Sequence, residues 1–269
     1  MLIAFIVAHL TSTGRTEVRI ASNFVANAVA QAAADGAIFE TIFNLSDPAP
    51  AQRWPVDGSV HEIVIGNSRV QVRLEDEAWW INPSTASPVL IEALLRITGS
   101  DPDSAHRLAS AISEWVGSAE ITRRQDAVVA EYRAAGLDYS PPGSPIETLG
   151  ELGRVIGMTP DVLAAIGPHL TLFGPPEPSP ATTDPVVAAA LALLGPQAGQ
   201  PIAPAGQAIS DFLTVRITAV ASGPANARVV RAAIVRAGPN LPQGYTVLAW
   251  RTGLEGGPSQ GTPAIPLTR

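Results

Sequence analysis

The apolar positions at the start of the chain predict one long helix. From Thr16 to about Asn44 there is no proline and alanine is abundant, and apolar residues recur at the spacing of one helical face. The residues of this face are Val18, Ala21, Phe24, Val25, Ala28, Val29 and Ala32. Because residues 1–10 are also apolar, we expect a single rod with an apolar front and an amphipathic rear.

Alternating patterns later in the chain predict strands. Residues 60–65 and 69–74 flank Gly66-Asn67-Ser68, and Val70, Val72 and Leu74 alternate with arginine and glutamine. Such alternation is typical of an antiparallel sheet that a helix covers on one side. Further strands are predicted at residues 212–220, 228–236 and 244–251, and the Pro- and Gly-rich tail beyond Leu254 is predicted to be disordered.

Between these strands, four sites place a capping oxygen directly before a proline, which favours a helix start. They are Ser87-Pro88, Asp101-Pro102, Ser144-Pro145 and Thr159-Pro160, and Asp184-Pro185 opens a further helix that ends near Gly195. Ser144 and Glu147 form a possible capping box. The second of these helices carries an apolar stripe of Ala105, Leu108, Ala109, Ile112, Trp115 and Val116.

This order of elements predicts an α+β fold in which a helical domain is inserted into the sheet. We expect an N-terminal helix at 1–46, the first part of the α/β domain at 47–82, the inserted helical domain at 83–204, and the second part with a flexible tail at 205–269. The apolar residues 1–10 are half the length that spans a bilayer and lack a signal peptide's charged start and cleavage site. They are interpreted as a membrane helix without its first turns, the alternative being a buried helix end.

Composition narrows the function classes. The formal net charge is −7 without a single lysine or a basic cluster, which disfavours binding to nucleic acid phosphates. The absence of cysteine excludes disulfides, thiolate nucleophiles and cysteine-ligated zinc.

Few residue patterns indicate chemistry. The cluster Glu75-Asp76-Glu77 could hold a hard cation or supply a catalytic carboxylate, but a solvated strand end is the commoner reading. His9, His61, His106 and His169 show no metal-ligand spacing, and there is no nucleophile elbow, phosphate loop or dinucleotide fingerprint. Trp79-Trp80 is interpreted as core packing at the junction of a strand and the helical block. A hydrolase or metal enzyme acting through the three carboxylates stays as a third possibility.

Residues 153–170 resemble a helix-hairpin-helix, a motif that offers backbone amides to DNA phosphate. Arg154 and His169 are the only basic groups in that stretch, whereas Glu147, Glu151 and Asp161 oppose an anionic partner. A helix-hairpin-helix DNA-binding protein of a DNA-uptake or competence system is therefore the alternative function.

Several strings in order along the chain resemble the K-type minor pseudopilins of bacterial type II secretion systems (general secretion pathway protein K family). Residues 13–23 resemble the stretch after that family's membrane segment, residues 74–86 resemble the entry to its inserted helical domain, and residues 245–251 resemble its closing strand. Glu131-Tyr132, Tyr139, residues 147–152 and Gly157-Met-Thr-Pro with Leu170-Thr171 follow the family's order. The motif residues that match are Arg15, Thr16, Glu17, Asp76, Glu77, Asn82, Thr85, Ala86, Trp115, Tyr132, Gly157 and Met158.

The resemblance implies a pseudopilin fold, a long N-terminal helix packed on an antiparallel sheet, with a SAM-like or helix-hairpin-helix-like insertion. It implies a single-pass protein of the bacterial inner membrane whose bulk lies in the periplasm. The implied partners are the I- and J-type minor pseudopilins at the filament tip and the major pseudopilin filament, and the implied protein has no catalytic residues and no nucleic-acid partner.

Family members often bind calcium through an acidic Asp-Trp-x-Asp stretch, whereas this chain has Ser113-Glu-Trp-Val116 there. Calcium takes six to eight oxygen ligands, several of them carboxylates. The remaining carboxylates, Glu114, Glu120, Asp126 and Glu131, are a dispersed set. We therefore expect weak or no calcium binding and no other cofactor.

Overall fold

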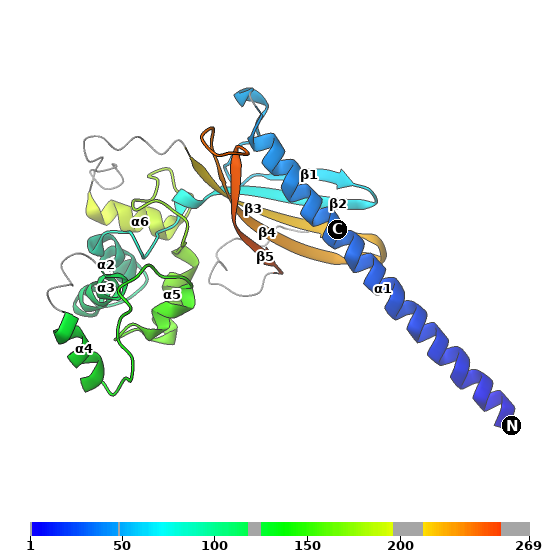
Figure 1. Cartoon of the computed structure of the whole chain (residues 1–269), viewed down its shortest axis with the longest axis horizontal. Helices are drawn as coiled ribbons and strands as arrows, with labels where there is room; N and C mark the ends of the chain where they lie inside the picture. Colours follow the sequence, from blue (N-terminus) through cyan, green and yellow to red (C-terminus); the bar gives the residue numbers. More distant parts are fainter. Residues whose placement is uncertain (1, 48, 118–124, 196–211, 254–269) are drawn as a thin grey trace. The chain divides into compact units, whose positions relative to one another are not determined.

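The computed structural model describes residues 2–47, 49–117, 125–195 and 212–253. These residues fall into two compact units (Figure 1). The sheet unit comprises described residues up to Asp76 together with 212–253, and the helical unit comprises described residues 77–195. The division after Asp76 lies six residues before the boundary expected at residue 82.

The sheet unit consists of one long helix on a five-stranded antiparallel sheet. The strands lie in chain order and are β1 (Val60–Ile65), β2 (Ser68–Asp76), β3 (Leu213–Ser222), β4 (Arg228–Ala237) and β5 (Tyr245–Thr252). Helix α1 (Leu2–Leu45) is the predicted single rod. The α+β fold and all five predicted strands are confirmed. The short 3-10 turn η1 (Pro50–Gln52) lies between α1 and β1, and η6 (Pro224–Asn226) lies between β3 and β4.

The helical unit is inserted between two strands that pair with each other. Strand β2 ends at Asp76 and β3 begins at Leu213, yet the two are antiparallel neighbours, with Leu74 opposite Ile217 and Asp76 opposite Val215. The sheet is thus a simple meander in space whose second connection carries the whole helical unit.

Small side chains on α1 bring the helix close to the sheet. Ala30, Ala34 and Ala37 have no exposed surface, and Ile38 and Ile42 extend the same stripe. They pack against the apolar positions of the strands: Val70, Val72 and Leu74, Val215, Ile217, Ala219 and Ala221, and Ala233 and Val235. The apolar residues of the alternating pattern predicted for β2 therefore lie on the buried face of the sheet.

The apolar face predicted for α1 is a different one from the face that packs on the sheet. Val18, Phe24 and Val25 are 70%, 72% and 63% exposed. The sheet instead contacts a stripe of alanines with Ile38 and Ile42, because small side chains let the helix axis lie close to the strands. Two apolar stripes therefore lie on α1, one buried and one exposed. The described helices include none that is both long and apolar enough to cross a membrane.

One ion pair fixes α1 over the sheet. The Nε atom of Arg231, on β4, lies 2.9 Å from Oδ1 of Asp35, and the arginine side chain is 6% exposed. The same guanidinium donates to the Thr252 hydroxyl on β5. A buried arginine paired in this way joins a helix to two strands and makes their register costly to shift.

In the helical unit, most of the predicted helix starts are confirmed. The helices are α2 (Pro88–Ile97), α3 (Pro102–Val116), α4 (Gln125–Ala134), α5 (Pro160–Ile166) and α6 (Pro185–Leu194), with 3-10 turns η2 (Glu77–Trp79), η4 (Leu149–Arg154) and η5 (Gly167–His169). Side chains of Ser87, Asp101, Thr159 and Asp184 each accept a backbone N–H as N-caps. The expected stripe on α3 is buried through Trp115.

The helix start predicted at Ser144-Pro145 is wrong. The N–H of Ile146 donates to the hydroxyl of Ser84 at 2.9 Å, and no helix begins at Pro145. The capping box forms at Thr148 and Glu151, at the start of η4, and the box predicted from Ser144 and Glu147 is absent. A tertiary hydrogen bond outweighs the local signal here.

Truncating the stripe of α1 that faces the sheet should destabilise the sheet unit. Ile38→Ala removes a fully buried side chain and is expected to cost about 2–5 kcal/mol of the free energy of unfolding. Phe43→Ala, on the same helix but 79% exposed, should stay within about 0.5 kcal/mol. Urea unfolding followed by circular dichroism measures both, and equal midpoints for the two variants would contradict this packing.

Candidate functional site

The segment through which the chain enters the helical unit, residues 77–82, pairs with residues 169–174 of the same unit, and the two segments are here called the clamp. The N–H of Ile81 donates to the carbonyl of His169 at 3.0 Å, and the N–H of Thr171 donates to the carbonyl of Ile81 at 2.9 Å. These two bonds form a parallel bridge between Ile81 and Leu170. The clamp thus joins two segments that are almost ninety positions apart in the sequence.

Glu77 is a structural part of the clamp. Its side chain is fully buried and accepts a hydrogen bond from the hydroxyl of Thr171, which in turn accepts the N–H of Phe173 at 3.1 Å. Glu75 and Asp76 belong to β2, whereas Glu77 opens η2. Among the described residues, no three His, Asp or Glu side chains form a group that could hold a metal ion.

Asn82 completes the clamp with its side-chain amide. Its Nδ2 donates to the carbonyls of Leu172 and Gly174, at 3.3 and 3.0 Å. Its Oδ1 accepts the N–H of Ser84 at 3.0 Å, and its carbonyl accepts the N–H groups of Thr85 and Ala86. A single asparagine therefore holds residues 172–174 and forms the turn that leads from the first clamp segment to α2.

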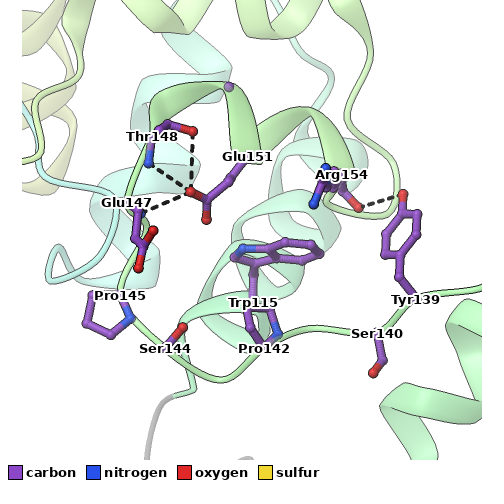
Figure 2. Close-up of a pocket in the computed structure, with 11 residues that line it drawn as sticks. Trp115, Tyr139, Ser140, Pro142, Ser144, Pro145, Glu147, Thr148, Glu151 and Arg154 are labelled. Carbon is purple, nitrogen blue, oxygen red and sulfur yellow. Dashed lines mark hydrogen bonds between the residues drawn. The ribbon is translucent and has the colours of Figure 1, made fainter.

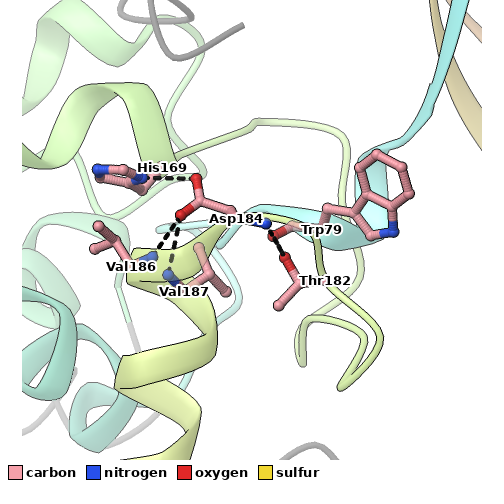
Figure 3. A network of polar contacts seen from close by, with 6 residues as sticks. All are labelled: Trp79, His169, Thr182, Asp184, Val186 and Val187. Atoms are coloured by element: carbon pink, nitrogen blue, oxygen red, sulfur yellow. Dashed lines mark hydrogen bonds and ion pairs between the residues drawn. The ribbon is translucent and has the colours of Figure 1, made fainter. Parts of the chain in front are cut away.

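A second polar network leads from the clamp to the start of α6 (Figure 3). Nδ1 of His169 lies 2.7 Å from Oδ2 of Asp184, and Oδ1 of Asp184 caps α6 by accepting the N–H groups of Val186 and Val187. Burial raises the pKa of the Asp184 carboxyl, but the hydrogen bonds from His169 and from the two amides outweigh burial and lower that pKa below its ordinary value.

The tryptophans of Trp79-Trp80 are both 7% exposed, so the interpretation as packing residues is confirmed. The carbonyl of Trp79 accepts the Thr182 hydroxyl at 2.8 Å (Figure 3). Near the C-terminal end of α3, Trp115, Tyr132 and Tyr139 form an aromatic cluster with ring centroids 6.0–6.3 Å apart. The Tyr132 hydroxyl accepts the N–H of Ile156 at 3.1 Å.

An open pocket of about 570 Å³ lies beside this cluster (Figure 2). Its walls combine aromatic rings, prolines, hydroxyls, two carboxylates and one arginine. The lining residues are Trp115, Tyr139, Ser140, Pro142, Ser144, Pro145, Glu147, Thr148, Gly150, Glu151 and Arg154. The sequence indicated several of these residues separately but gave no signal that they share a pocket.

A close backbone approach shapes one wall of the pocket. Gly117 ends α3 with a positive φ of 76°, and a Cβ built there would lie 2.6 Å from the carbonyl oxygen of Gly143. The N–H of Gly143 donates to the carbonyl of Trp115 at 3.2 Å. The loop that carries the pocket's serines and prolines is thus held against the end of α3.

The other predicted motif residues are scattered through the fold. Glu17 is exposed on α1, and the side chains of Arg15 and Thr16 lie outside the described residues. Gly157 has a positive φ of 85° before α5, and Met158 packs on the helical core. The structure brings Glu77 and Asn82 together through Thr171 and Gly174, and Trp115 together with Tyr132.

The calcium candidates are not assembled in the part of the chain that the structure describes. Glu120 falls outside the described residues, and Asp126 and Glu131 are exposed on α4. Glu114 precedes Trp115 on α3, and no metal-holding group includes it among the described side chains. Calcium binding stays a sequence-based expectation of weak or no affinity.

Adding a methyl group at Gly117 should open the pocket wall. Gly117→Ala combines an unfavourable positive φ with a steric clash, whereas Gly136→Ala, at φ 79° with nothing within 4 Å, carries only the conformational cost of about 1–2 kcal/mol. Gly117→Ala is expected to lower the free energy of unfolding by clearly more than Gly136→Ala in chemical denaturation. Equal losses would show that the approach to Gly143 contributes nothing.

The Asp184 network should make stability depend on acid pH. The folded pKa of Asp184 is lowered, so its contribution is complete above the unfolded pKa of about 4 and is lost as the pH falls through the folded value. Asp184→Ala is expected to cost about 1–2 kcal/mol at pH 7 and less at pH 3. Asp184→Asn keeps a capping oxygen without the charge, and thermal unfolding across pH should show a smaller loss for it. A cost of Asp184→Ala that is independent of pH would contradict the charged network.

Residues 72–176 match the family described as Type II secretion system (T2SS), protein K. No curated protein sequence matches the chain. Among solved structures, a chain in the crystal structure of the GspK-GspI-GspJ complex from the enterotoxigenic Escherichia coli type 2 secretion system has a similar fold. The two share 16% identity with a TM-score of 0.55, over 90% of this chain and 100% of that one. The matched residues begin in β2 and run through both segments of the clamp, and they confirm the resemblance of this chain to the K-type minor pseudopilins of type II secretion systems.

Proposed function

We propose that this protein is a structural minor pseudopilin at the tip of the type II secretion pseudopilus. In that role it helps to initiate filament assembly and thereby the export of proteins across the outer membrane. It joins I- and J-type minor pseudopilins, as the similar GspK chain is found with GspI and GspJ in its crystal structure. The observation that carries the proposal is the protein K match over the clamp and most of the helical unit.

The exposed stripe of α1 supports assembly through helix packing. Val18, Phe24, Val25 and Val29 are exposed along one stretch of the helix, and Phe43 is 79% exposed nearer its end. Large apolar side chains that recur along a helix mark a surface for interaction with other proteins or with lipid. We assign this stripe to contact with the helices of neighbouring pseudopilins, including the major pseudopilin below the tip.

The proposal includes a membrane-bound origin for the subunit. Its N-terminal helix is anchored in the inner membrane, with the bulk of the chain in the periplasm, until the subunit enters the filament. Transfer of an apolar helix from lipid to equally apolar neighbouring helices avoids exposing it to water, which would cost about 25 cal/mol per Å². Extraction from the membrane and assembly are therefore coupled steps.

The helical unit gives the subunit its capping role. Residues 77–195 add a second compact body to a single connection of the sheet, and a subunit that carries such bulk leaves no room for another to stack above it. The same residues contain fourteen Asp and Glu against six Arg, which opposes the DNA-binding alternative. The subunit acts by shape and contact, without a catalytic step.

Co-purification tests the partners. The full chain, co-expressed with the soluble domains of I- and J-type pseudopilins, should form a complex with one copy of each, as measured by native mass spectrometry. Phe24→Glu puts a charge on the exposed stripe of α1 and should weaken the complex about tenfold or more, since burial of such a side chain contributes about 1.5–3 kcal/mol.

Asn23→Asp is the matched control. It also places a charge on an exposed position of α1, but on a different side of the helix from Val18, Val25 and Val29, and the complex should persist unchanged. A chain that stays monomeric with both partners would overturn the proposed role, and equal weakening by both variants would remove α1's stripe from the interface.

A further inference from the structure

The pocket beside α3 has the size and the construction of a binding site. A volume of about 570 Å³ lies within the range of small-ligand pockets and accommodates one long side chain with its flanking backbone. Its walls come from the end of α3, the loop that precedes η4, and η4 itself (Figure 2). All of these elements belong to the helical unit.

One buried polar group in the wall lacks a partner. The Trp115 side chain is 3% exposed, and its Nε1–H has no hydrogen-bond acceptor among the described residues. Buried donors are nearly always paired, so an unpaired one calls for an explanation. In Figure 2 the indole nitrogen is directed towards the side of the pocket where Glu147, Thr148 and Glu151 lie. An acceptor supplied there by a ligand would satisfy this donor.

Negative charge gathers at the same side of the pocket. Glu147 is exposed and forms no ion pair with any described residue. Glu151 uses Oε1 to accept the N–H groups of Glu147 and Thr148 at 3.2 and 2.8 Å, which fixes its carboxylate in place. A cation entering the pocket therefore meets one free and one fixed carboxylate.

The opposite side offers different groups. The ring of Tyr139 is 38% exposed, and its hydroxyl donates to the carbonyl of Arg154 at 3.2 Å, which fixes the ring's orientation. A half-exposed tyrosine ring accommodates the methylene stem of a long basic side chain and attracts its cation. The guanidinium of Arg154 supplies donors for the carbonyl oxygens of a peptide backbone.

We propose that this pocket binds an extended polypeptide segment through an arginine or lysine side chain. The cation lies between Glu147 and Glu151, its stem packs on Tyr139, and a carbonyl of the flanking backbone accepts the Trp115 indole N–H. The charge of the surrounding unit is complementary, since residues 77–195 hold fourteen carboxylates against six arginines. Binding is a property of the chain alone and is measured without the filament partners.

A titration with acetyl-Gly-Arg-Gly-amide tests the proposal. The full chain has five tryptophans, so its nitrogen-15 NMR spectrum contains five indole signals, and Trp115→Phe identifies the one from Trp115. The peptide should shift that signal in a saturable manner. Glu147→Gln should weaken binding about tenfold, because a charge-assisted hydrogen bond is lost, whereas Glu131→Gln on α4 outside the pocket should leave the affinity unchanged.

Two further ligands test the contributions of the cation and of the backbone carbonyl separately. The peptide with citrulline in place of arginine keeps the backbone and loses the cation, and it should bind at least about tenfold more weakly. Agmatine keeps the guanidinium without a carbonyl, and it should not shift the Trp115 signal in the same way. An unshifted Trp115 signal at millimolar peptide, equal effects of the two glutamate variants, or equal binding of agmatine would each overturn the proposal.

Discussion

The structure depends on the closure of the clamp by Glu77, Ile81 and Asn82. Without these contacts, more than a hundred residues would form one unconstrained loop between two paired strands. Bringing the ends of such a loop together costs conformational entropy. The buried carboxylate of Glu77 and the amide of Asn82 bind residues 171–174 of the second clamp segment directly. They shorten the effective connection between β2 and β3 and let the helical unit fold around its own base.

The local parts of this architecture could be predicted from the sequence. N-caps at Ser87, Asp101, Thr159 and Asp184 involve atoms two or three positions away, so the sequence contains everything that determines them. Apolar and polar residues alternate along the strands because one face of the sheet is buried. Ser144 has the same local signal, but the hydroxyl of Ser84, about sixty positions away, accepts the backbone N–H of Ile146, and no helix starts there.

Contacts between residues far apart in the sequence could not be predicted from local patterns. The apolar spacing on α1 predicted the face that carries Val18, Phe24 and Val25, whereas the face that contacts the sheet carries Ala30, Ala34 and Ala37 with Ile38. Which of two apolar faces is buried depends on how closely the helix can approach the strands, and the periodicity does not contain that information. The pocket requires Trp115 at the end of one helix and Glu151 at the start of another element, joined by an approach between Gly117 and Gly143. The resemblance to a family identified Asn82 and Glu77 as motif residues. The structure shows a contact for both, because each forms a hydrogen bond to the second segment of the clamp, residues 169–174.

The pairing of β2 with β3 also sets an order of events in synthesis. Strand β2 leaves the ribosome before the helical unit, but its neighbour β3 begins only at Leu213. The helical unit consists of contacts within one continuous stretch, which form early and quickly, whereas the sheet waits for distant strands. During that interval the stripe of Val70, Val72 and Leu74 has no β3 beside it. The sheet is therefore completed only when β3, β4 and β5 have been synthesised. A nascent chain that stops within the helical unit would expose the apolar face of β1 and β2 without the other strands.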